Sequence, residues 1–210
     1  MTLNLNGHST TEAHMCTGHI SKWEHYFAKI DISDVALLEI PAFEDSYMDA
    51  VRSKTRNMVR KAENNGYDYS TFKYNDHLKD MERVNKSTPY RQDRRMGDSY
   101  RQRVTPIMEG VPACHLHTQV YIGGFKDDHL VAYCWLVLCN QVAILNRIIG
   151  HADHLRGGVM NGLIKEIVEN CQRHRAIQYL NYLNMASSTD SLEGFKKRVG
   201  FESYKVRIAQ

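Results

Sequence analysis

The sequence predicts an α/β fold in which a mixed, mostly antiparallel sheet is flanked by helices. Three β-rich runs separated by short polar turns lie between residues 118 and 149, and this arrangement is typical of an antiparallel meander. A segment with apolar residues at helical spacing follows over residues 157–174. Strand-like and helix-like segments also alternate on both sides of this region, which indicates helices packed on a mixed sheet.

The N-terminal half supplies four of the expected elements. Pro41 ends the first strand, and Asn64-Asn65-Gly66 supplies a stop for the first helix. Asn75-Asp76 is expected to cap the second helix, which runs to about residue 86. The irregular, basic segment 88–114 contains at most a short helix near residues 98–103. The other expected bounds are strand 35–40, helix 49–64 and strand 67–74.

The C-terminal half has a clearer pattern. Turns at residues 126–129 and near Asn140 separate the three strands of the meander. In the long helix that follows, Leu163, Ile167 and Cys171 recur at helical spacing and predict one buried face. The expected elements are strands 118–125, 130–138 and 142–149, helix 157–174, strand 177–183, helix 191–199 and strand 201–208.

Length and composition indicate one globular domain. The chain has 210 residues, of which 42% are hydrophobic and 24% charged, so one well-buried core is expected. We expect residues 1–20 to form a flexible N-terminus and residues 21–210 to form a single domain, because no linker divides the chain. A net charge of +3 does not by itself indicate a nucleic-acid partner.

Cysteine usage and hydropathy indicate a cytoplasmic protein. The five cysteines are odd in number and contain no CxxC pair, so we expect reduced, buried thiols. The N-terminus lacks the basic start and apolar run of a signal peptide. The longest apolar run, residues 130–139, is shorter than the roughly 20 residues that a membrane span requires, so no membrane partner is expected.

The order of elements and two short motifs carry a resemblance to a known family. Gly194-Phe195-Lys196-Lys197 leads into Gly200-Phe201 at the start of the last strand, and a basic helix runs from Arg52 through Arg60-Lys61-Ala62-Glu63. Over about residues 35–208 the chain resembles the GNAT superfamily of N-acyltransferases. Its motifs are most similar to the Fem-type aminoacyl transferase (BioF2-like acetyltransferase) branch. The resemblance implies an acyltransferase whose donor-binding and catalytic half is residues 115–210.

In this family a thioester donor lies where two strands part, and its pyrophosphate sits at the N-terminus of the next helix. The resemblance therefore implies that Arg156 contacts phosphate and that Gly157 and Gly158 allow close backbone approach. Ile148 and Ile149, at the end of the preceding strand, complete the expected donor site. The loop departs from the family's Arg/Gln-x-x-Gly-x-Gly/Ala spacing. A purely structural role for the two glycines, as a cap of the helix, is the alternative.

Lys196 is the first candidate catalytic residue. Many family members have a tyrosine at this position as the acid for the leaving thiolate, whereas the Fem-type branch has a Phe-Lys pair. The resemblance implies that the Lys196 ammonium stabilises charge that develops during transfer. The alternative is that Lys196, Lys197 and Arg198 form a solvated helix face.

Acylation of an amine also requires a base, because only the neutral amine attacks. The candidates are His117 on the first meander strand, Asp153 in the loop, and Tyr182 or Tyr179 on the strand after the long helix. Neighbouring strand residues face opposite sides of a sheet, so at most one of Tyr182 and Asn181 points into a cleft. The favoured alternative is that each tyrosine belongs to the core or its rim.

No metal is expected. His117 lies close in sequence to His115 and Cys114, so a metal site is the alternative interpretation. Further ligands do not follow at the spacing of a zinc site.

Two groups of arginines suggest a phosphate-bearing partner. Arg52, Arg56 and Arg60 share one face of the basic helix. Arg91 and Arg95 lie in the irregular segment that follows the second helix. These five residues are the candidate substrate-binding set, for a nucleotide-linked acceptor, tRNA or DNA. A solvated, purely structural face is the alternative.

Three functions remain open from the sequence. The first is an N-acyltransferase that moves an acyl group from acyl-CoA, with acetyl-CoA as the expected donor, to an amine acceptor. The second is Fem-type transfer from aminoacyl-tRNA. The third is a non-catalytic nucleic-acid-binding module on the same fold. The acceptor groove is completed either by residues 1–115 or by a second subunit of a homodimer.

Overall fold

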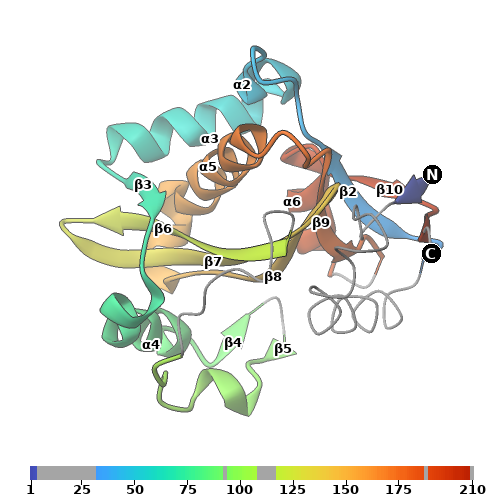
Figure 1. Ribbon diagram of the computed structural model, residues 1–210. Coiled ribbons are helices and arrows are strands. Elements are labelled where there is room, and N and C mark those ends of the chain that lie inside the picture. The colour runs from blue at the N-terminus through green and yellow to red at the C-terminus, as the bar shows by residue number, and fades with distance from the viewer. Residues whose placement is uncertain (4–31, 92–93, 108–116, 187–188, 209–210) are drawn as a thin grey trace.

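The computed structural model describes residues 1–3, 32–91, 94–107, 117–186 and 189–208. Its centre is a seven-stranded sheet with helices on both faces (Figure 1). The order of strands across the sheet is β10-β2-β9-β8-β7-β6-β3. The strands are β2 (Val35–Glu39), β3 (Asp68–Thr71), β6 (His117–Lys126), β7 (His129–Cys139), β8 (Val142–Gly150), β9 (Tyr179–Asn184) and β10 (Glu202–Tyr204).

The sheet is mixed and mostly antiparallel, as the sequence predicts. β6, β7 and β8 form the expected meander, with β3 added antiparallel at its outer edge. β2 is antiparallel to both β9 and β10. Of the pairs in this sheet, β8 and β9 alone are parallel, and the connection between them is the longest helix.

Of the α-helices in the described residues, four pack on one face of the sheet and one packs on the other. The first group comprises α2 (Tyr47–Ala50), α3 (Ser53–Asn64), α5 (Val159–Arg173) and α6 (Asp190–Arg198). In Figure 1, α2, α3 and α5 lie above the sheet, whereas α4 (Leu78–Lys86) lies below it.

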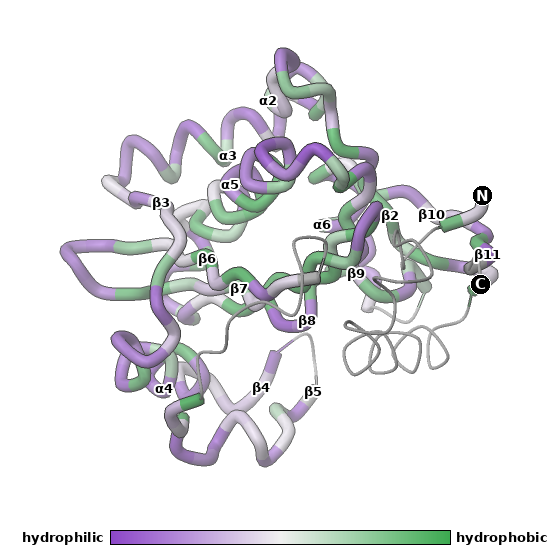
Figure 2. Tube along the Cα trace, in the orientation of Figure 1, coloured by the Kyte–Doolittle hydropathy of each residue, from purple (hydrophilic) through white to green (hydrophobic). Residues whose placement is uncertain are grey.

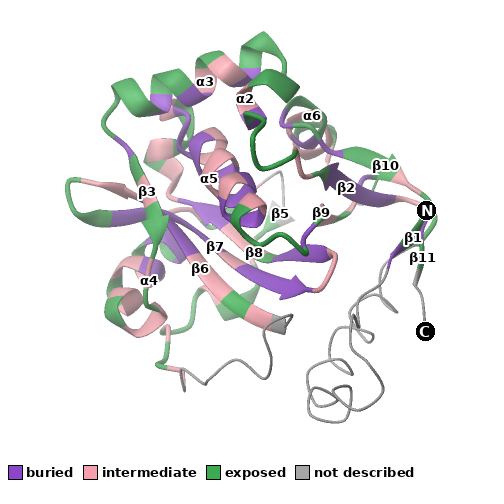
Figure 3. Cartoon of the chain, turned by 45° about the horizontal axis from the view of Figure 1, so that its top comes forward, coloured by how far each residue is buried: buried purple, intermediate pink, exposed green. Residues whose placement is uncertain are grey.

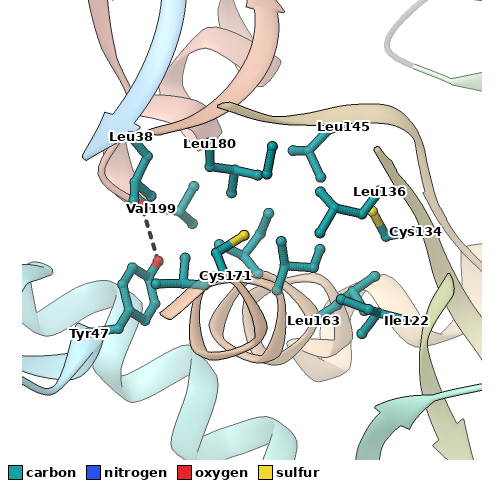
Figure 4. Packing of buried hydrophobic residues seen from close by; sticks show 14 of the residues in the cluster. Leu38, Tyr47, Ile122, Cys134, Leu136, Leu145, Leu163, Cys171, Leu180 and Val199 are labelled. Carbon is teal, nitrogen blue, oxygen red and sulfur yellow. Dashed lines mark hydrogen bonds between the residues drawn. The ribbon is translucent and has the colours of Figure 1, made fainter. Parts of the chain in front are cut away.

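The main core lies between α5 and the sheet. The buried face of α5 presents Leu163, Ile167 and Cys171 to the sheet, where Leu136 and Leu180 meet them (Figure 4). The hydropathy of the chain follows this packing, because the green apolar segments of Figure 2 concentrate on the central strands and α5. Burial of apolar surface here is the main stabilising term of the fold.

The opposite face carries two smaller apolar clusters. One packs Met81 and Val84 of α4 against Tyr133 of β7. The other joins Leu3 to Val35 of β2 and Ile144 of β8. The apolar residues on this face of the sheet therefore form two separate clusters rather than one continuous core.

Short elements complete the structure. β1 (Thr2–Leu3) pairs in parallel with β11 (Arg207–Ile208), and β4 (Tyr90–Arg91) pairs with β5 (Arg94–Arg95). Three 3-10 helices are η1 (Tyr74–His77), η2 (Asp98–Tyr100) and η3 (Ala152–Gly157). The two small pairings and η3 are not predicted from the sequence.

Several predicted bounds are wrong in the N-terminal half. The single helix expected over residues 49–64 is two helices, α2 and α3, because Val51 and Arg52 adopt extended backbone between them. The strand expected over residues 67–74 ends at Thr71, and Tyr74 already begins η1. Asn75 does not cap α4; its side chain instead pairs with the backbone of Ile107.

Two bounds also change in the C-terminal half. The long helix begins at Val159 rather than at residue 157, because Gly158 has a φ of 89° and ends η3. The last strand is divided into β10 and β11, which belong to different sheets. The expected strand 177–183 is β9, shifted by one or two residues.

The described cysteines are buried, as expected, and form no disulfide with one another. They are Cys134, Cys139 and Cys171, and burial raises the pKa of the Cys134 and Cys171 thiols. Cys16 and Cys114 lie outside the described residues, as do residues 4–20 of the expected N-terminal segment. None of the helices in the described ranges is both long and apolar enough to cross a bilayer.

We predict that Tyr47→Phe lowers the free energy of unfolding by about 1 kcal/mol, because it removes one buried hydrogen bond. The Tyr47 hydroxyl donates to the Val199 carbonyl at 2.8 Å and joins α2 to the end of α6 (Figure 4). Chemical denaturation measures the change. Tyr204→Phe is the control, since its hydroxyl reaches Glu39 at the exposed surface. Equal effects of the two changes would contradict the prediction.

Candidate functional site

The sheet opens between β8 and β9. Their parallel pairing extends only from Val142 to Ile144 on β8 and from Tyr179 to Asn181 on β9. β8 nevertheless continues to Gly150 and β9 to Asn184. Beyond these three pairs, the facing backbone edges have no partner strand in the described part of the sheet. Backbone N–H and C=O groups require partners, so these edges can accept a ligand.

A bulge in β8 contributes to the opening from the β8 side. Leu136 of β7 pairs with Leu145, whereas Trp135 pairs with Arg147. Asn146 is therefore an extra residue without a cross-strand partner in β7, and its side chain is exposed. A bulge bends its strand and increases the local twist, which turns the end of β8 away from β9.

A second irregularity lies in β9. Leu37 of β2 pairs with Asn181 and Val35 pairs with Asn184, so β9 has one extra residue between them. Leu183 occupies this point with a φ of 56°. A left-handed conformation costs a residue with a Cβ about 1–2 kcal/mol, so the surrounding contacts must hold it.

Asn181 supplies part of that support. Its side chain is fully buried, and its amide nitrogen donates to the carbonyls of Ala36 at 3.2 Å and Leu183 at 3.3 Å. It thereby ties the bulge to the neighbouring strand. The Asn181 Oδ1 atom is buried without a hydrogen-bond partner among the described residues.

Lys196 of α6 lies beside this bulge. Its side chain is 1% exposed, and its Nζ donates to the Asn184 carbonyl at 2.7 Å. The same ammonium lies 4.7 Å from the centre of the Tyr182 ring. Burial lowers the pKa of Lys196 to about 8, despite the opposing effect of Asp34 and Glu193. The side chain is therefore mostly protonated at neutral pH but can release its proton just above it.

Tyr182 is the second predicted catalytic residue that the structure places here. Its ring packs edge-on against Phe201, with 5.6 Å between centroids. Burial raises the pKa of the Tyr182 hydroxyl, so it remains protonated at neutral pH and cannot act as a base. The structure thus brings Lys196 and Tyr182 together, with Tyr182 and Asn181 on opposite faces of β9, as expected.

His117 does not lie beside Lys196 and Tyr182. It is the first residue of β6, and its backbone is paired with Cys139 at the end of the meander away from the bulge in β8. The side chain of His117 lies outside the described residues. Asp153 is exposed at the start of η3, and the half-buried Tyr179 packs with the cluster around Leu3.

The loop expected to hold the donor's phosphates is filled by η3. A Cβ on Gly157 would lie 2.7 Å from the Tyr67 hydroxyl, and one on Gly158 would lie 2.4 Å from the Met58 carbonyl oxygen. Both glycines therefore permit close packing of the loop, Gly158 against α3 and Gly157 against Tyr67, which lies between α3 and β3. The predicted alternative, a structural role, accounts for these contacts.

The other expected donor residues lie around this loop. Arg156 is exposed and makes no hydrogen bond or ion pair with the described residues. Ile148 packs with the core under α5, whereas Ile149 is buried on the opposite face with α4. Only Ile148 therefore faces the side of the sheet that carries the loop. The imidazole of His154 pairs with the Tyr67 hydroxyl at 2.8 Å.

The candidate substrate-binding arginines form two separate groups. Arg52, directly before α3, and Arg60 within it are exposed, and the outer side of α3 is largely green in Figure 3. Arg56 instead folds back and donates to the carbonyl of Val51. Arg91 and Arg95 lie on β4 and β5, on the other side of the sheet (Figure 1). One surface does not contain both groups.

Sequence reasoning missed Arg147, which follows the bulge in β8. It is half-buried, and its guanidinium carbon lies 4.7 Å above the centre of the Tyr100 ring. A single arginine inside the apolar strand 142–149 was the sequence signal that could have identified it.

Among the described residues, no group of three or more His, Cys, Asp or Glu side chains is placed to hold a metal.

Known proteins match this chain by structure only. No family model and no curated protein matches its sequence. FemX superposes with a TM-score of 0.58 at 8% identity, over 81% of this chain and 59% of FemX. The C-terminal domain (DUF2156) of a protein described as a lysylphosphatidylglycerol synthetase from Agrobacterium fabrum gives 0.51 at 13%, over 90% and 62%. L-PGS from Bacillus licheniformis gives 0.50 at 10%, over 82% and 58%.

These similarities confirm the fold that the sequence resemblance implies. The chain shares its overall fold with FemX, with the DUF2156 domain and with L-PGS. It spans about 60% of the length of the proteins it matches.

We predict that Gly158→Ala lowers the free energy of unfolding by about 2 kcal/mol or more. The added methyl group would collide with a backbone carbonyl at a residue whose φ is positive. Gly97→Ala is the matched control, because a Cβ there meets nothing within 4 Å. Thermal and urea denaturation report both changes, and a Gly158→Ala protein as stable as Gly97→Ala would contradict the packing.

We also predict a specific pH dependence for the burial of Lys196. Its folded pKa of about 8 lies below the unfolded value of 10.5, so the unfolded chain holds more protons between these values. The cost of burying the charge is present below pH 8 and is relieved as the pH rises. Between pH 7.5 and 9.5, the wild type should therefore gain stability relative to Lys196→Met. Parallel stability curves for the two proteins would show that Lys196 is not desolvated.

Proposed function

We propose that this protein is an N-acyltransferase that moves an acyl group from acyl-CoA, with acetyl-CoA as the first donor to test, to an amine acceptor. The observation that carries the proposal is the buried ammonium of Lys196 beside the opening between β8 and β9. A GNAT-like fold alone does not establish an activity, so the argument depends on this site. The buried thiols of Cys134 and Cys171, which form no disulfide, also support a reducing, cytoplasmic location.

The exposed backbone edges of the opening suit an acyl-CoA donor. The pantetheine arm of coenzyme A carries amide groups that can hydrogen-bond to a strand edge as another strand would. The segment of β8 from Leu145 to Gly150 offers such an edge after its pairing with β9 ends. A donor bound here would place its thioester between β8 and the bulge of β9.

Lys196 has the charge and the pKa for the chemical step. Attack of a neutral amine on the thioester carbonyl forms a C–N bond and an oxyanion, and collapse then breaks the C–S bond. The amine nitrogen loses one proton and the leaving thiolate gains one. An ammonium with a pKa of about 8 matches an ordinary thiol, whose pKa is about 8.5, and stabilises negative charge on either atom.

Tyr182 serves in this proposal as a positioning residue. Its ring lies against the Lys196 ammonium and fixes the direction of the Nζ atom together with the Asn184 carbonyl. No base is proposed from this geometry, because the backbone of His117 lies at the end of β6 away from the opening.

We predict that Lys196→Met lowers kcat for acetyl transfer by about 100-fold or more, because one preorganised charge is removed. The assay follows release of coenzyme A thiol from acetyl-CoA in the presence of a panel of primary amines. Lys197→Met is the matched control, since Lys197 is exposed and pairs with Glu193. It should change kcat less than twofold. Full activity in a folded Lys196→Met protein would exclude a catalytic role for this residue.

A second candidate is transfer from aminoacyl-tRNA, as expected of the Fem-type branch. The packing of Gly157 and Gly158 against Tyr67 and Met58 favours it, because this loop does not present the glycines to a pyrophosphate. FemX also shares the fold. Lys196 would act in the same way on an ester donor, and exposed Arg52 and Arg60 on α3 would contact the phosphates of tRNA.

We predict that, under this second candidate, replacing both Arg52 and Arg60 by Gln weakens tRNA binding and reduces the slope of log K against log salt by about 2.

Melting temperature measured with acetyl-CoA, coenzyme A and bulk tRNA separates the donors. Stabilisation by acetyl-CoA but not tRNA supports the first candidate. Stabilisation by tRNA without turnover of either donor supports the non-catalytic module. Light scattering tests whether a homodimer completes the acceptor groove.

A further inference from the structure

Arginine and aromatic side chains gather on the sheet face opposite α5, where α4 and η2 pack. Arg147 comes from β8, Tyr133 from β7 and Tyr100 from η2. Arg91 comes from β4, beyond the end of α4. The pKa values of both arginines respond to the hydroxyls of Tyr100 and Tyr133, so the two guanidinium groups share one set of neighbours. We call these four residues the arginine–tyrosine cluster.

Arg147 has no acidic partner in this cluster. No ion pair joins it to any carboxylate of the described residues. Burial lowers the pKa of its guanidinium, but the adjacent hydroxyls of Tyr133 and Tyr100 outweigh burial and leave the pKa raised. The ring of Tyr100 stacks against the cation at 4.7 Å. A half-buried cation held only by aromatic groups keeps several N–H donors for a further acceptor.

The surroundings of Arg147 contain further unused donors. Arg91 uses one terminal nitrogen for Ser87 Oγ at 2.9 Å and the Val84 carbonyl at 3.3 Å. Its Nε atom is buried and has no partner among the described residues. The same is true of Nε1 of Trp135, which is the direct cross-strand neighbour of Arg147. Buried donors without acceptors are rare and costly, and they indicate a missing acceptor.

The cluster supplies Arg147 with one acceptor only, the Tyr133 oxygen, which donates its own proton to Asn85 Oδ1 at 2.7 Å. Nε of Arg91 and Nε1 of Trp135 have no acceptor among the described residues. The group that would satisfy these donors must carry several acceptor oxygens and negative charge. Phosphate and carboxylate groups have this chemistry, and the planar fork of arginine binds both in a bidentate manner.

We propose that Arg147 and Arg91, with Trp135 Nε1, form a binding site for the phosphate or carboxylate group of a ligand on the face opposite α5. Arg147 lies three residues beyond Ile144, the last β8 residue that pairs with β9. The site is therefore next to the opening of the sheet and on the other side from the η3 loop. If the proposed acyl transfer holds, the anionic group belongs to the acceptor; the site itself does not depend on that activity.

Binding of inorganic pyrophosphate, inorganic phosphate and succinate to the full chain tests the site. Ionic strength is held constant with NaCl, so that general screening does not mimic binding. The readout is Trp135 fluorescence in a Trp23→Phe background, which leaves Trp135 as the sole tryptophan. We expect saturable binding by at least one probe. Preference for the phosphates or for succinate then identifies the anion.

Arg147→Gln should raise the Kd of the preferred probe at least tenfold, because it removes the bidentate donor. Arg101→Gln is the matched control: it removes the same charge from an exposed residue next to Tyr100 and should change the Kd less than twofold. Arg147→Lys retains the charge without the planar fork and should weaken binding at least threefold. If the Arg147→Gln protein does not fold, the Arg147→Lys protein is used to test the site instead.

Two results would overturn the proposal. One is the absence of saturable binding of all three probes to a folded wild-type protein. The other is a folded Arg147→Gln or Arg147→Lys protein with the wild-type Kd. Loss of acetyl transfer has no bearing on either readout, so the anion site and the proposed function fail independently.

Discussion

The parting of β8 and β9 is the constraint on which the other features of the site depend. Parallel neighbours would normally continue to pair, yet these two strands pair over only three residues each. The extra residue Asn146 turns β8 away, and the extra residue in β9 places Leu183 in a left-handed conformation. Asn181, fully buried, holds that conformation through two carbonyl contacts. Irregular backbone of this kind costs free energy and is retained where a ligand or a reaction uses it. The opening also separates the η3 loop on one face from the arginine–tyrosine cluster on the other.

Lys196 connects the opening to the rest of the fold. Its ammonium reaches the carbonyl of Asn184, at the end of the irregular part of β9, and lies on the ring of Tyr182. α6 therefore cannot shift without disturbing β9. The end of α6 is in turn joined to α2 through the hydroxyl of Tyr47. Burial lowers the pKa of this ammonium to about 8, so that Lys196 can lose a proton slightly above neutral pH. The same desolvation would strengthen its interaction with a developing negative charge.

The sequence allowed the element order and the meander to be predicted, because hydrophobic period and turn residues are local signals. Lys196 and Tyr182 were separate candidates, and their contact was not predicted. It did not allow the bulges to be predicted, since an extra residue such as Asn146 is defined only by the register of the neighbouring strand. Gly157 and Gly158 illustrate the same limit. Two glycines before a helix suggest space for a phosphate, but the space is filled by Tyr67 and by the Met58 carbonyl, which come from a distant part of the chain. Arg147 was missed because its environment is formed by four separate segments.

Amide hydrogen exchange in the presence and absence of acetyl-CoA tests the central claim, that the opening between β8 and β9 is the donor site. The amides of β8 between Asn146 and Ile148 that do not bond to β7, and those of Tyr182 and Leu183 in β9, should exchange readily in the free protein. Saturating acetyl-CoA should slow exchange at both edges while leaving the β6–β7 amides unchanged. Bound donor that protects neither edge, or that protects only residues remote from the opening, would contradict the account.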